Sequence, residues 1–317
     1  MKPGIIGPAH DPQVRRVARR LRELDATGPV VLDLSRFPGS GRASLVDGVP
    51  ACPGVDVGAV GCWYLRSMPL ALPFQPLREV DPHGSATALL DAARRAFAAG
   101  RERRSFLASF VAGLARAGAT LVNAPAAAAQ HFLKLEQLEL LRAAGVPLPR
   151  TLATNDPEAV ADLAASLDGA LVYKPLAGGG LCRRVTDDDL RPQRLRALAA
   201  APVLFQEEIP GRNIRVYVVG GRIAASYEIA SDELDYRGAE TSVRTAEPSD
   251  AERAACIAAA AACGMTFTGI DVRRRPDGSF ALLECNPSPM FAAIERRTGG
   301  APVTEMLANL LRGAALR

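Results

Sequence analysis

Two apolar runs, Thr268 to Arg273 and Phe280 to Glu284, flank the tripeptide Pro276-Asp277-Gly278. Both runs are short and rich in residues that favour strands, and the tripeptide is typical of a tight turn. The sequence therefore predicts a β-hairpin with two antiparallel strands side by side. This feature constrains the fold strongly, because a hairpin determines which side chains can face one another.

Acidic and amide side chains lie along this predicted hairpin. Glu284 and Asn286 are two residues apart and point to the same face of a strand, and an antiparallel register can bring Asp271 opposite them. Carboxylate and amide oxygens are hard ligands that suit Mg²⁺, which completes its coordination with water and phosphate oxygens. A polar edge face that binds no metal is the alternative, and the cluster alone leaves both open. Cys285 points to the opposite face, where packing is its expected role.

Lysine is rare in this chain. Only Lys2, Lys134 and Lys174 are lysines among the 38 lysines and arginines. An ammonium group is a compact, strongly hydrated point charge, so an internal lysine kept in such a chain is a candidate for a site that needs this charge. A solvated surface position is the alternative, and it suits Lys2 well.

Lys174 lies in a predicted apolar strand, Ala170 to Pro175, where a buried cation needs an anionic partner or a path to solvent. Three glycines, Gly178, Gly179 and Gly180, follow this strand. Glycines let backbone amides approach a phosphate group closely. A triple glycine alone is more often just a turn, but next to Lys174 it indicates a site for nucleotide phosphates.

A third candidate segment runs from Gln206 to Arg215. A strand end followed by an exposed turn can present backbone groups to an adenine edge, while polar side chains reach the ribose. A strand that leads into a solvated loop is the usual alternative for such a segment.

Composition restricts the class of protein. Apolar residues make up 48% and charged residues 23% of 317 residues, which is typical of a soluble globular protein with two or three compact parts. The net charge of +4 comes from scattered arginines, so nucleic acid is not expected as a ligand. No run of apolar residues is long enough for a membrane span, and the start, Met1 to Arg22, becomes rich in arginine where a signal peptide would need its apolar segment. A cytoplasmic location without membrane contact is expected. The six cysteines lack a CxxC pair and are expected as reduced core thiols.

Local patterns predict an α/β beginning and an antiparallel α+β second half. The histidines lack metal-ligand spacing, and Glu295 with Arg296 is expected on a helix surface. The predicted elements include strands at Gly4 to Gly7 and Val30 to Leu34, helices at Asp11 to Leu24 and Thr87 to Ala117, a loop from Phe37 to Val55, a helical run from Ala126 to Ala144 and a helix from Ser249 to Cys263.

The three clusters, in this order and spacing, resemble the ATP-grasp superfamily, and in particular the RimK-like peptide and amino-acid ligases. The resemblance covers about Asn123 to Leu311, and its most specific part is Phe267 to Phe291. It implies an ATP-grasp fold that follows an N-terminal pre-ATP-grasp α/β domain. The expected parts are residues 1–122 for that first domain, 123–205 for a central lid subdomain and 206–317 for a C-terminal catalytic subdomain.

The resemblance also implies roles for individual residues. Arg215 is expected to stabilise the transferred phosphoryl group, Arg237 to contact phosphate or substrate, and Asn213 stands where an acidic residue commonly accepts hydrogen bonds from the ribose. An amide accepts more weakly than a carboxylate. The expected phosphate contacts are Lys134, Lys174, Gly178, Gly179 and Gly180, the adenine hinge is Gln206, Glu207, Glu208 and Ile209, and the magnesium ligands are Asp271, Glu284 and Asn286.

The implied activity is an ATP-dependent carboxylate-amine ligase that forms an amide through an acyl phosphate. Its cofactors would be ATP and Mg²⁺, with two ions expected and Mn²⁺ as an alternative metal. Its partners would be a small carboxylate and an amine, either amino acid or peptide. Two alternatives stay open: a peptide cyclase that forms side-chain ester or amide crosslinks, and a nucleotide-binding regulatory protein without turnover. The sequence leaves the identity of both substrates and the oligomeric state open, a homo-oligomer included.

Overall fold

The computed structural model describes residues 1–35, 37–39, 41–66, 85–177, 181–236 and 239–316. The chain divides into two compact units, Met1–Pro125 with Leu307–Arg317, and Ala126–Met306. Each unit has its own sheets and its own apolar core.

The first unit contains a parallel sheet with strand order β2-β1-β5-β6. Helix α1 follows β1, and Asp11 begins it by accepting hydrogen bonds from the amides of Gln13 and Val14. Val14, Val17 and Leu21 are buried at helical spacing. The elements are β1 Lys2–Ile6, α1 Pro12–Leu24, β2 Val30–Leu32, β5 Val60–Leu65, α2 Ala86–Arg116 and β6 Thr120–Val122.

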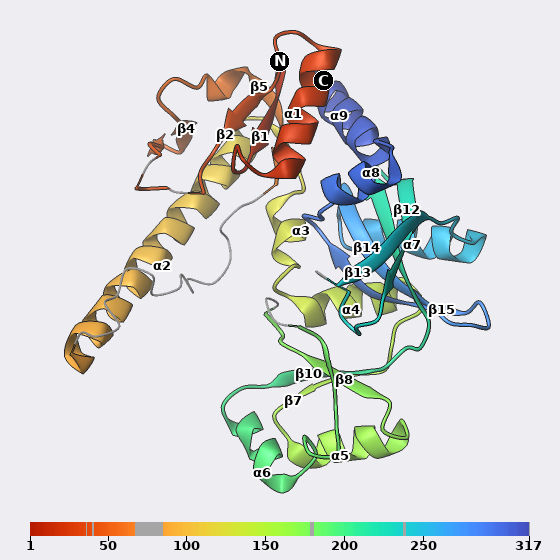
Figure 1. Ribbon diagram of the computed structural model, residues 1–317. Helices are drawn as coiled ribbons and strands as arrows, with labels where there is room; N and C mark the ends of the chain where they lie inside the picture. Colours follow the sequence, from red (N-terminus) through yellow and green to blue (C-terminus); the bar gives the residue numbers. More distant parts are fainter. Residues whose placement is uncertain (36, 40, 67–84, 178–180, 237–238, 317) are drawn as a thin grey trace. The chain divides into compact units, whose positions relative to one another are not determined.

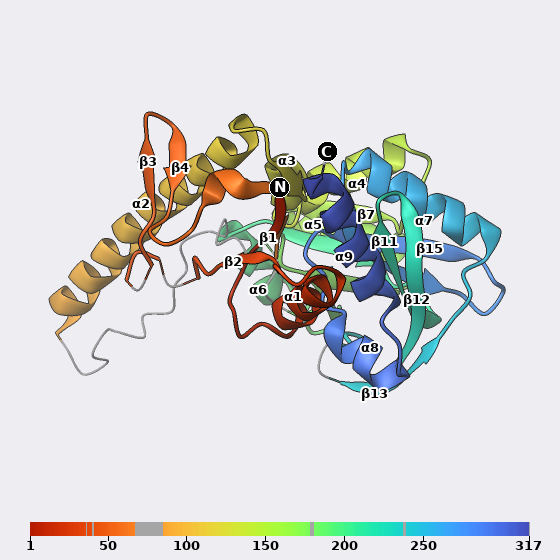
Figure 2. The same ribbon diagram turned by 90° about the horizontal axis from the view of Figure 1, so that it is seen from above.

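A small hairpin interrupts the segment that was expected to be a loop. Strands β3 Ser44–Val46 and β4 Val49–Ala51 pair through a turn at Asp47-Gly48, and both turn residues have positive φ, 51° and 83°. An Asp-Gly pair favours this turn because it tolerates that conformation, so the expectation of a loop was wrong here. The hairpin lies beside α2 (Figure 2), and a Cβ at Gly113 of α2 would come within 2.7 Å of Pro50.

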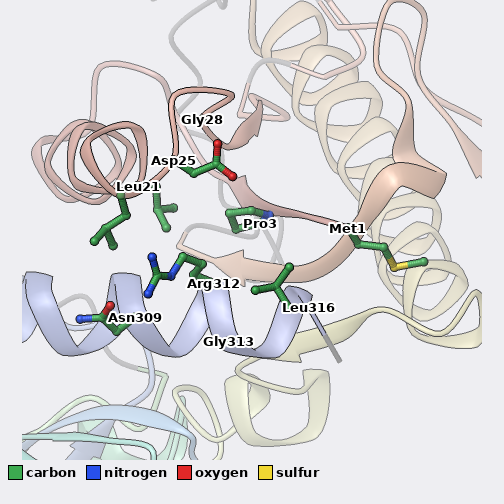
Figure 3. A pocket seen from close by; sticks show the side chains of 10 residues that line it. Met1, Pro3, Leu21, Asp25, Gly28, Asn309, Arg312, Gly313 and Leu316 are labelled. Carbon is green, nitrogen blue, oxygen red and sulfur yellow. The ribbon is translucent and has the colours of Figure 1, made fainter.

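The first unit also has a cavity of about 490 Å³. Leu21 of α1, Pro3 of β1 and Arg312 of the C-terminal helix α9, Pro302–Ala315, line it (Figure 3). Its lining mixes apolar side chains with Asp25, Asn309 and Arg312.

The second unit contains a small antiparallel sheet of order β7-β10-β8-β9. Helices α5 and α6 lie on one side of it (Figure 1), and Leu171 and Phe205 pack with Val160 of α5 there. Because strand faces alternate, Lys174 and Gln206 lie on the opposite face. The elements are β7 Thr151–Thr154, α5 Pro157–Ser166, β8 Leu171–Lys174, β9 Arg183–Arg184, α6 Pro192–Leu195 and β10 Val203–Glu207.

A larger antiparallel sheet of order β13-β12-β11-β14-β15 completes this unit. One face carries buried apolar residues such as Val216 and Ile270, which form a core with α7, Asp250–Ala262. A capping box between Ser249 and Glu252 begins α7 at the expected position. The strands are β11 Arg212–Val219, β12 Arg222–Ser231, β13 Glu240–Thr245, β14 Phe267–Arg274 and β15 Phe280–Asn286.

The predicted helical run from Ala126 to Ala144 is broken into two helices, α3 Pro125–Ala129 and α4 Lys134–Ala143. Between them, four successive amides donate to carbonyls three residues earlier, a tighter turn than an α-helix. Leu133 then takes a non-helical conformation with φ of −109°. The break places Lys134 in the first turn of a new helix.

Two smaller expectations also need correction. Glu295 in α8, Ala292–Thr298, is buried with 1% exposure, because its carboxylate accepts hydrogen bonds from the amide (2.9 Å) and hydroxyl (2.5 Å) of Thr304 in α9. Arg296 is exposed, as expected. None of the six cysteines, all of which lie among the described residues, forms a disulfide, as expected, but Cys182 is only half-buried and so lies outside the cores. Among the described residues, no helix is long and apolar enough to cross a membrane.

Candidate active site

A row of charged side chains crosses the open face of the larger sheet. The pairing places Arg215 on β11 opposite Asp271 on β14, and Asp271 opposite Glu284 on β15. The predicted hairpin register is therefore confirmed. Asn286 pairs with Gly269 one step along, on the same face as Glu284.

A β-bulge beside this row sets the face that Glu284 takes. Val272 pairs with Leu282, but Asp271 pairs with Glu284, so Leu283 is an extra residue on β15. In a regular ladder Leu282 and Glu284 would share a face, and Leu282 is buried in the core. The bulge lets Leu282 stay in the core while Glu284 faces the row, which is a common use of bulges near functional sites.

Asp271 is held by two donors at the same carboxylate oxygen. Arg215 Nη1 lies 2.6 Å from Asp271 Oδ1, and the Tyr236 hydroxyl donates to that oxygen at 2.7 Å. Arg215 is buried and lies over the Tyr217 ring, 5.6 Å from its centroid. Burial alone would lower the pKa of Arg215, but Asp271 outweighs it and raises the pKa well above its usual value. Burial, with Asp271, raises the pKa of Tyr236, so its hydroxyl keeps its proton as a donor.

Gly269 provides the space for the arginine. A Cβ there would lie 2.8 Å from Nε and Nη2 of Arg215 and 2.7 Å from Pro289. Real Cβ atoms essentially never come within 3.0 Å of another heavy atom, so a side chain at this position would displace the guanidinium of Arg215. The position of Arg215 in the row therefore requires glycine at residue 269.

Glu284 pairs with Lys134, whose Nζ lies 2.5 Å from Oε2. Burial would raise the pKa of Glu284, but the charges of Lys134 and Lys174 outweigh it and lower the pKa to about 2. The carboxylate is therefore ionised at neutral pH. Lys134 reaches it from the first turn of α4.

Lys174 lies on the open face of the small sheet and makes no hydrogen bond or ion pair with any residue that the structure describes. Burial lowers its pKa, and attraction to Glu284 only partly offsets that effect. Lys134 and Arg215 each have a carboxylate partner, whereas Lys174 does not. A cation in this position is suited to receive an anion.

Gln137 of α4 holds the strand that carries two of the expected metal ligands. Its side-chain amide donates to the carbonyl of Cys285 at 2.8 Å and accepts from the amide of Cys285 at 2.8 Å. Gln137 is buried, and it lies one helical turn from Lys134. This clamp fixes α4 to β15 between Glu284 and Asn286.

Replacing Gln137 with leucine leaves two buried backbone groups of Cys285 without partners. We expect the free energy of unfolding to fall by about 2 kcal/mol, since each unsatisfied buried group costs about 1–3 kcal/mol. Denaturant unfolding measures the change, with Glu136→Leu on the exposed side of the same helix as the control. Equal stability of the two variants would contradict the clamp.

The expected adenine hinge has its side chains engaged elsewhere. The side-chain amide of Gln206 donates to the Thr151 hydroxyl at 3.0 Å. The Glu207 carboxylate pairs with Arg275 at 3.2 Å, and the Glu208 carboxylate pairs with Arg184 at 2.8 Å. The Glu208 amide donates to the carbonyl of Ala170. Among the described residues, the Glu208 carbonyl and the Ile209 amide remain without a hydrogen bond, and such an acceptor and donor pair suits an adenine edge.

Asn213 is also engaged. Its Oδ1 accepts from Arg273 Nη1 at 2.6 Å, and its Nδ2 donates to the carbonyl of Ile229 at 3.3 Å. A ribose hydroxyl would therefore compete with Arg273 for this oxygen.

Asn286 Oδ1 accepts from the Ser288 amide at 2.9 Å and retains a second lone pair. The remaining expected site residues, Gly178 to Gly180 and Arg237, lie outside the described residues.

The donor set fits Mg²⁺ together with phosphates. In the described parts of the chain, no group of three Asp, Glu, His or Cys side chains forms a metal cage by itself. Two carboxylates and one amide oxygen remain, and Mg²⁺ is usually held by one or two carboxylates plus water and substrate phosphates. Lys134, Lys174 and Arg215 supply positive charge around this set.

Comparison with known proteins decides the family. The family described as the RimK-like ATP-grasp domain matches residues 133–310. The chain belongs to this family. The resemblance and the α/β fold class expected from the sequence are therefore confirmed.

Several relatives of this RimK-like chain are ligases by name. "Probable alpha-L-glutamate ligase" of Enterobacter sp. (strain 638) is 32% identical over 177 residues, which is 52% of this chain and 59% of the relative. The protein of the same name from Saccharophagus degradans is 33% identical over 195 residues, 57% of this chain and 64% of the relative. The RimK-like chain thus spans less than two thirds of the length of these curated relatives.

Solved structures match over nearly the whole chain. The ATP-grasp ligase PsnB, complexed with a phosphomimetic variant of its minimal precursor, Mg and ADP, is 34% identical with a TM-score of 0.83, covering 98% of both chains. The macrocyclase MdnC from Microcystis aeruginosa MRC, bound with precursor peptide MdnA, is 21% identical with a TM-score of 0.80, covering 98% of this chain and 99% of MdnC, and shows the fold alone.

Sequence patterns missed Tyr236 and Gln137. Tyr236 stands beside Arg237, for which the resemblance implied a role, whereas a tyrosine hydroxyl in a loop gives no local sign of its partner. Gln137 sits in an ordinary helical stretch, and its backbone partner lies 148 residues away in the sequence.

Proposed function

We propose that this protein is an ATP-dependent ligase that activates a carboxylate as an acyl phosphate and joins it to an amine. One observation carries the proposal: Lys134, Glu284, Asp271 and Arg215 form a contiguous row in which two cations flank two carboxylates, a charge arrangement that suits Mg²⁺ and the phosphates of a nucleoside triphosphate. The membership in the RimK-like family supports it, and so do the ligase names of its relatives.

The side chains act mainly by position and charge. Lys174 and Lys134 bind phosphate oxygens, and Arg215 offsets the charge that spreads over the transferred phosphoryl group. Asp271, Glu284 and Asn286 would hold Mg²⁺, which would supply positive charge to neutralise the phosphate oxygens. The Glu208 carbonyl and the Ile209 amide bind the adenine edge. The substrate carboxylate then displaces ADP, and the nucleophile displaces phosphate from the acyl phosphate.

A peptide cyclase is the second candidate, favoured by a specific observation. The similarity to PsnB covers both units of this chain, whereas the similarity to the glutamate ligases covers little more than half of it. PsnB and MdnC are complexed with precursor peptides. In this case both the carboxylate and the nucleophile, a hydroxyl or an amine, belong to side chains of one peptide.

A single assay distinguishes these functions. The protein is incubated with ATP, Mg²⁺ and pooled amino acids or carboxylate-bearing peptides, and ADP formation and product mass are measured. A product heavier by one amine minus water supports ligation, and a peptide lighter by one water supports cyclisation. No ADP formation with any pool, despite nucleotide binding, would leave the regulatory alternative and reject both.

Some finer expectations remain proposals. These are the three-part division at residues 122 and 205, a pair of metal ions with Mn²⁺ as a substitute, a cytoplasmic location and a homo-oligomer.

A further inference from the structure

Two adjacent residues in the loop after β12 contact two different sheets. Asp235 Oδ2 accepts a hydrogen bond from the Cys182 amide at 3.1 Å. The hydroxyl of Tyr236, the next residue, donates to Asp271 Oδ1 at 2.7 Å. The two contacts are one peptide unit apart, so a displacement of either partner is transmitted over a single residue.

The two partners belong to different parts of the candidate site. Cys182 immediately precedes β9, which pairs with β8, the strand that ends at Lys174. Asp271 lies in the larger sheet, opposite Glu284. Asp235 and Tyr236 therefore connect the sheet that carries the unpaired lysine to the carboxylate that is expected to bind metal.

The contact to Asp271 determines which of its oxygens is available. Tyr236 and Arg215 both approach Oδ1, from a hydroxyl and a guanidinium. Two donors at one oxygen restrict the rotation of the carboxylate and leave Oδ2 available to another partner. Without the hydroxyl, Arg215 alone would hold the carboxylate, and its rotation would be less restricted.

We propose that Asp235 and Tyr236 form a clasp that couples the position of the small sheet to the orientation of Asp271. Tyr236 is a positioning residue, and Asp235 anchors it to the Cys182 amide. The consequence is cooperative binding: nucleotide phosphates that engage Lys174 favour the metal-binding orientation of Asp271, and by reciprocity Mg²⁺ favours the nucleotide. This inference rests on the proposed function, because that function makes Asp271 a metal ligand.

The first test needs no ligand. Hydrogen exchange of a peptide that covers residues 181–184 is compared between the wild-type protein, Asp235→Asn and Tyr236→Phe. Asp235→Asn weakens the acceptor of the Cys182 amide and is expected to speed its exchange. Tyr236→Phe is expected to speed it as well, although Tyr236 does not bond to Cys182. Unchanged exchange in Tyr236→Phe would overturn the coupling.

The second test measures binding by calorimetry with ADP and Mg²⁺. We expect Tyr236→Phe to leave the affinity for ADP without Mg²⁺ unchanged and to lower the Mg²⁺ affinity of the ADP complex by roughly tenfold or more, as for other partners of metal ligands. Tyr173→Phe, which removes a hydroxyl on the helix-covered face of the small sheet, is the control and should bind as the wild type does.

The outcomes separate the clasp from the function on which it rests. If the wild-type protein binds no ADP with Mg²⁺, the proposed function fails, while the exchange experiment still reports on the clasp. If the wild-type protein binds both and Tyr236→Phe matches it in Mg²⁺ affinity, the clasp fails and the proposed function stands.

Discussion

Replacing Lys174 with methionine lowers the rate of ADP formation by roughly a hundredfold or more, because a donor to the developing phosphoryl charge is lost. The substitution should not lower the stability of the folded protein. Burial lowers the pKa of Lys174, and a pKa below that of the unfolded chain means that its charge opposes folding at neutral pH. We therefore expect the melting temperature to stay the same or rise while turnover falls, measured on the same sample.

Two further variants serve as controls for the effect of Lys174→Met. Lys2→Met removes an exposed lysine of the first unit and should change neither property. Lys174→Arg keeps the charge but replaces the point charge with a planar fork, and it should restore only part of the rate. A folded Lys174→Met protein with wild-type kinetics would remove Lys174 from the mechanism.

Replacing Glu284 with glutamine raises the Mg²⁺ concentration needed for half-maximal ADP formation by roughly tenfold or more. Mutation of a residue that only hydrogen-bonds to a metal ligand typically lowers metal affinity by about 10–100-fold. Loss of an ionised ligand should lower it at least as much. The carboxylate is ionised at neutral pH, since its pKa is lowered to about 2. A magnesium titration of the rate measures the shift.

The control for this change lies on the same helix as the lysine partner of Glu284. Glu139→Gln removes an exposed carboxylate of α4 and should leave the magnesium titration unchanged. The Glu284 variant also leaves Lys134 without its ion pair, so a loss of stability is expected in addition, and the magnesium titration is made at a temperature where the variant is folded. If its magnesium titration overlays that of the wild type, Glu284 is not a ligand.

Local patterns predicted the parts of this site that depend on one hairpin. Glu284 and Asn286 share a face because they are two residues apart, and the turn at Pro276-Asp277-Gly278 brings Asp271 opposite. Lys134 and Lys174 stood out because the chain otherwise uses arginine. The spacing and the turn are local features of one hairpin, and the rarity of lysine is a feature of composition, so all of them can be read without knowledge of the fold.

The features that sequence did not predict depend on contacts between distant segments. The bulge at Leu283 is specified by core packing of Leu282 on one face and the charged row on the other. The break before Lys134 accompanies a buried contact of Gln130 with the carbonyl of Cys263, 133 residues away. Tyr236, in a loop, and Gln137, in α4, contact partners in strands that are distant in the sequence. Periodicity cannot reveal such partners, because neither residue departs from the pattern of its own segment.

The bulge at Leu283 also affects how two molecules can meet. β15 is the last strand of its sheet, and a straight last strand offers a row of backbone groups on which a second chain can assemble. The extra residue bends this row, and Gln137 already occupies both groups of Cys285. Together with the hydrogen bond from the Leu282 amide to the carbonyl of Pro147, these features leave few backbone groups of β15 on which a second chain could assemble.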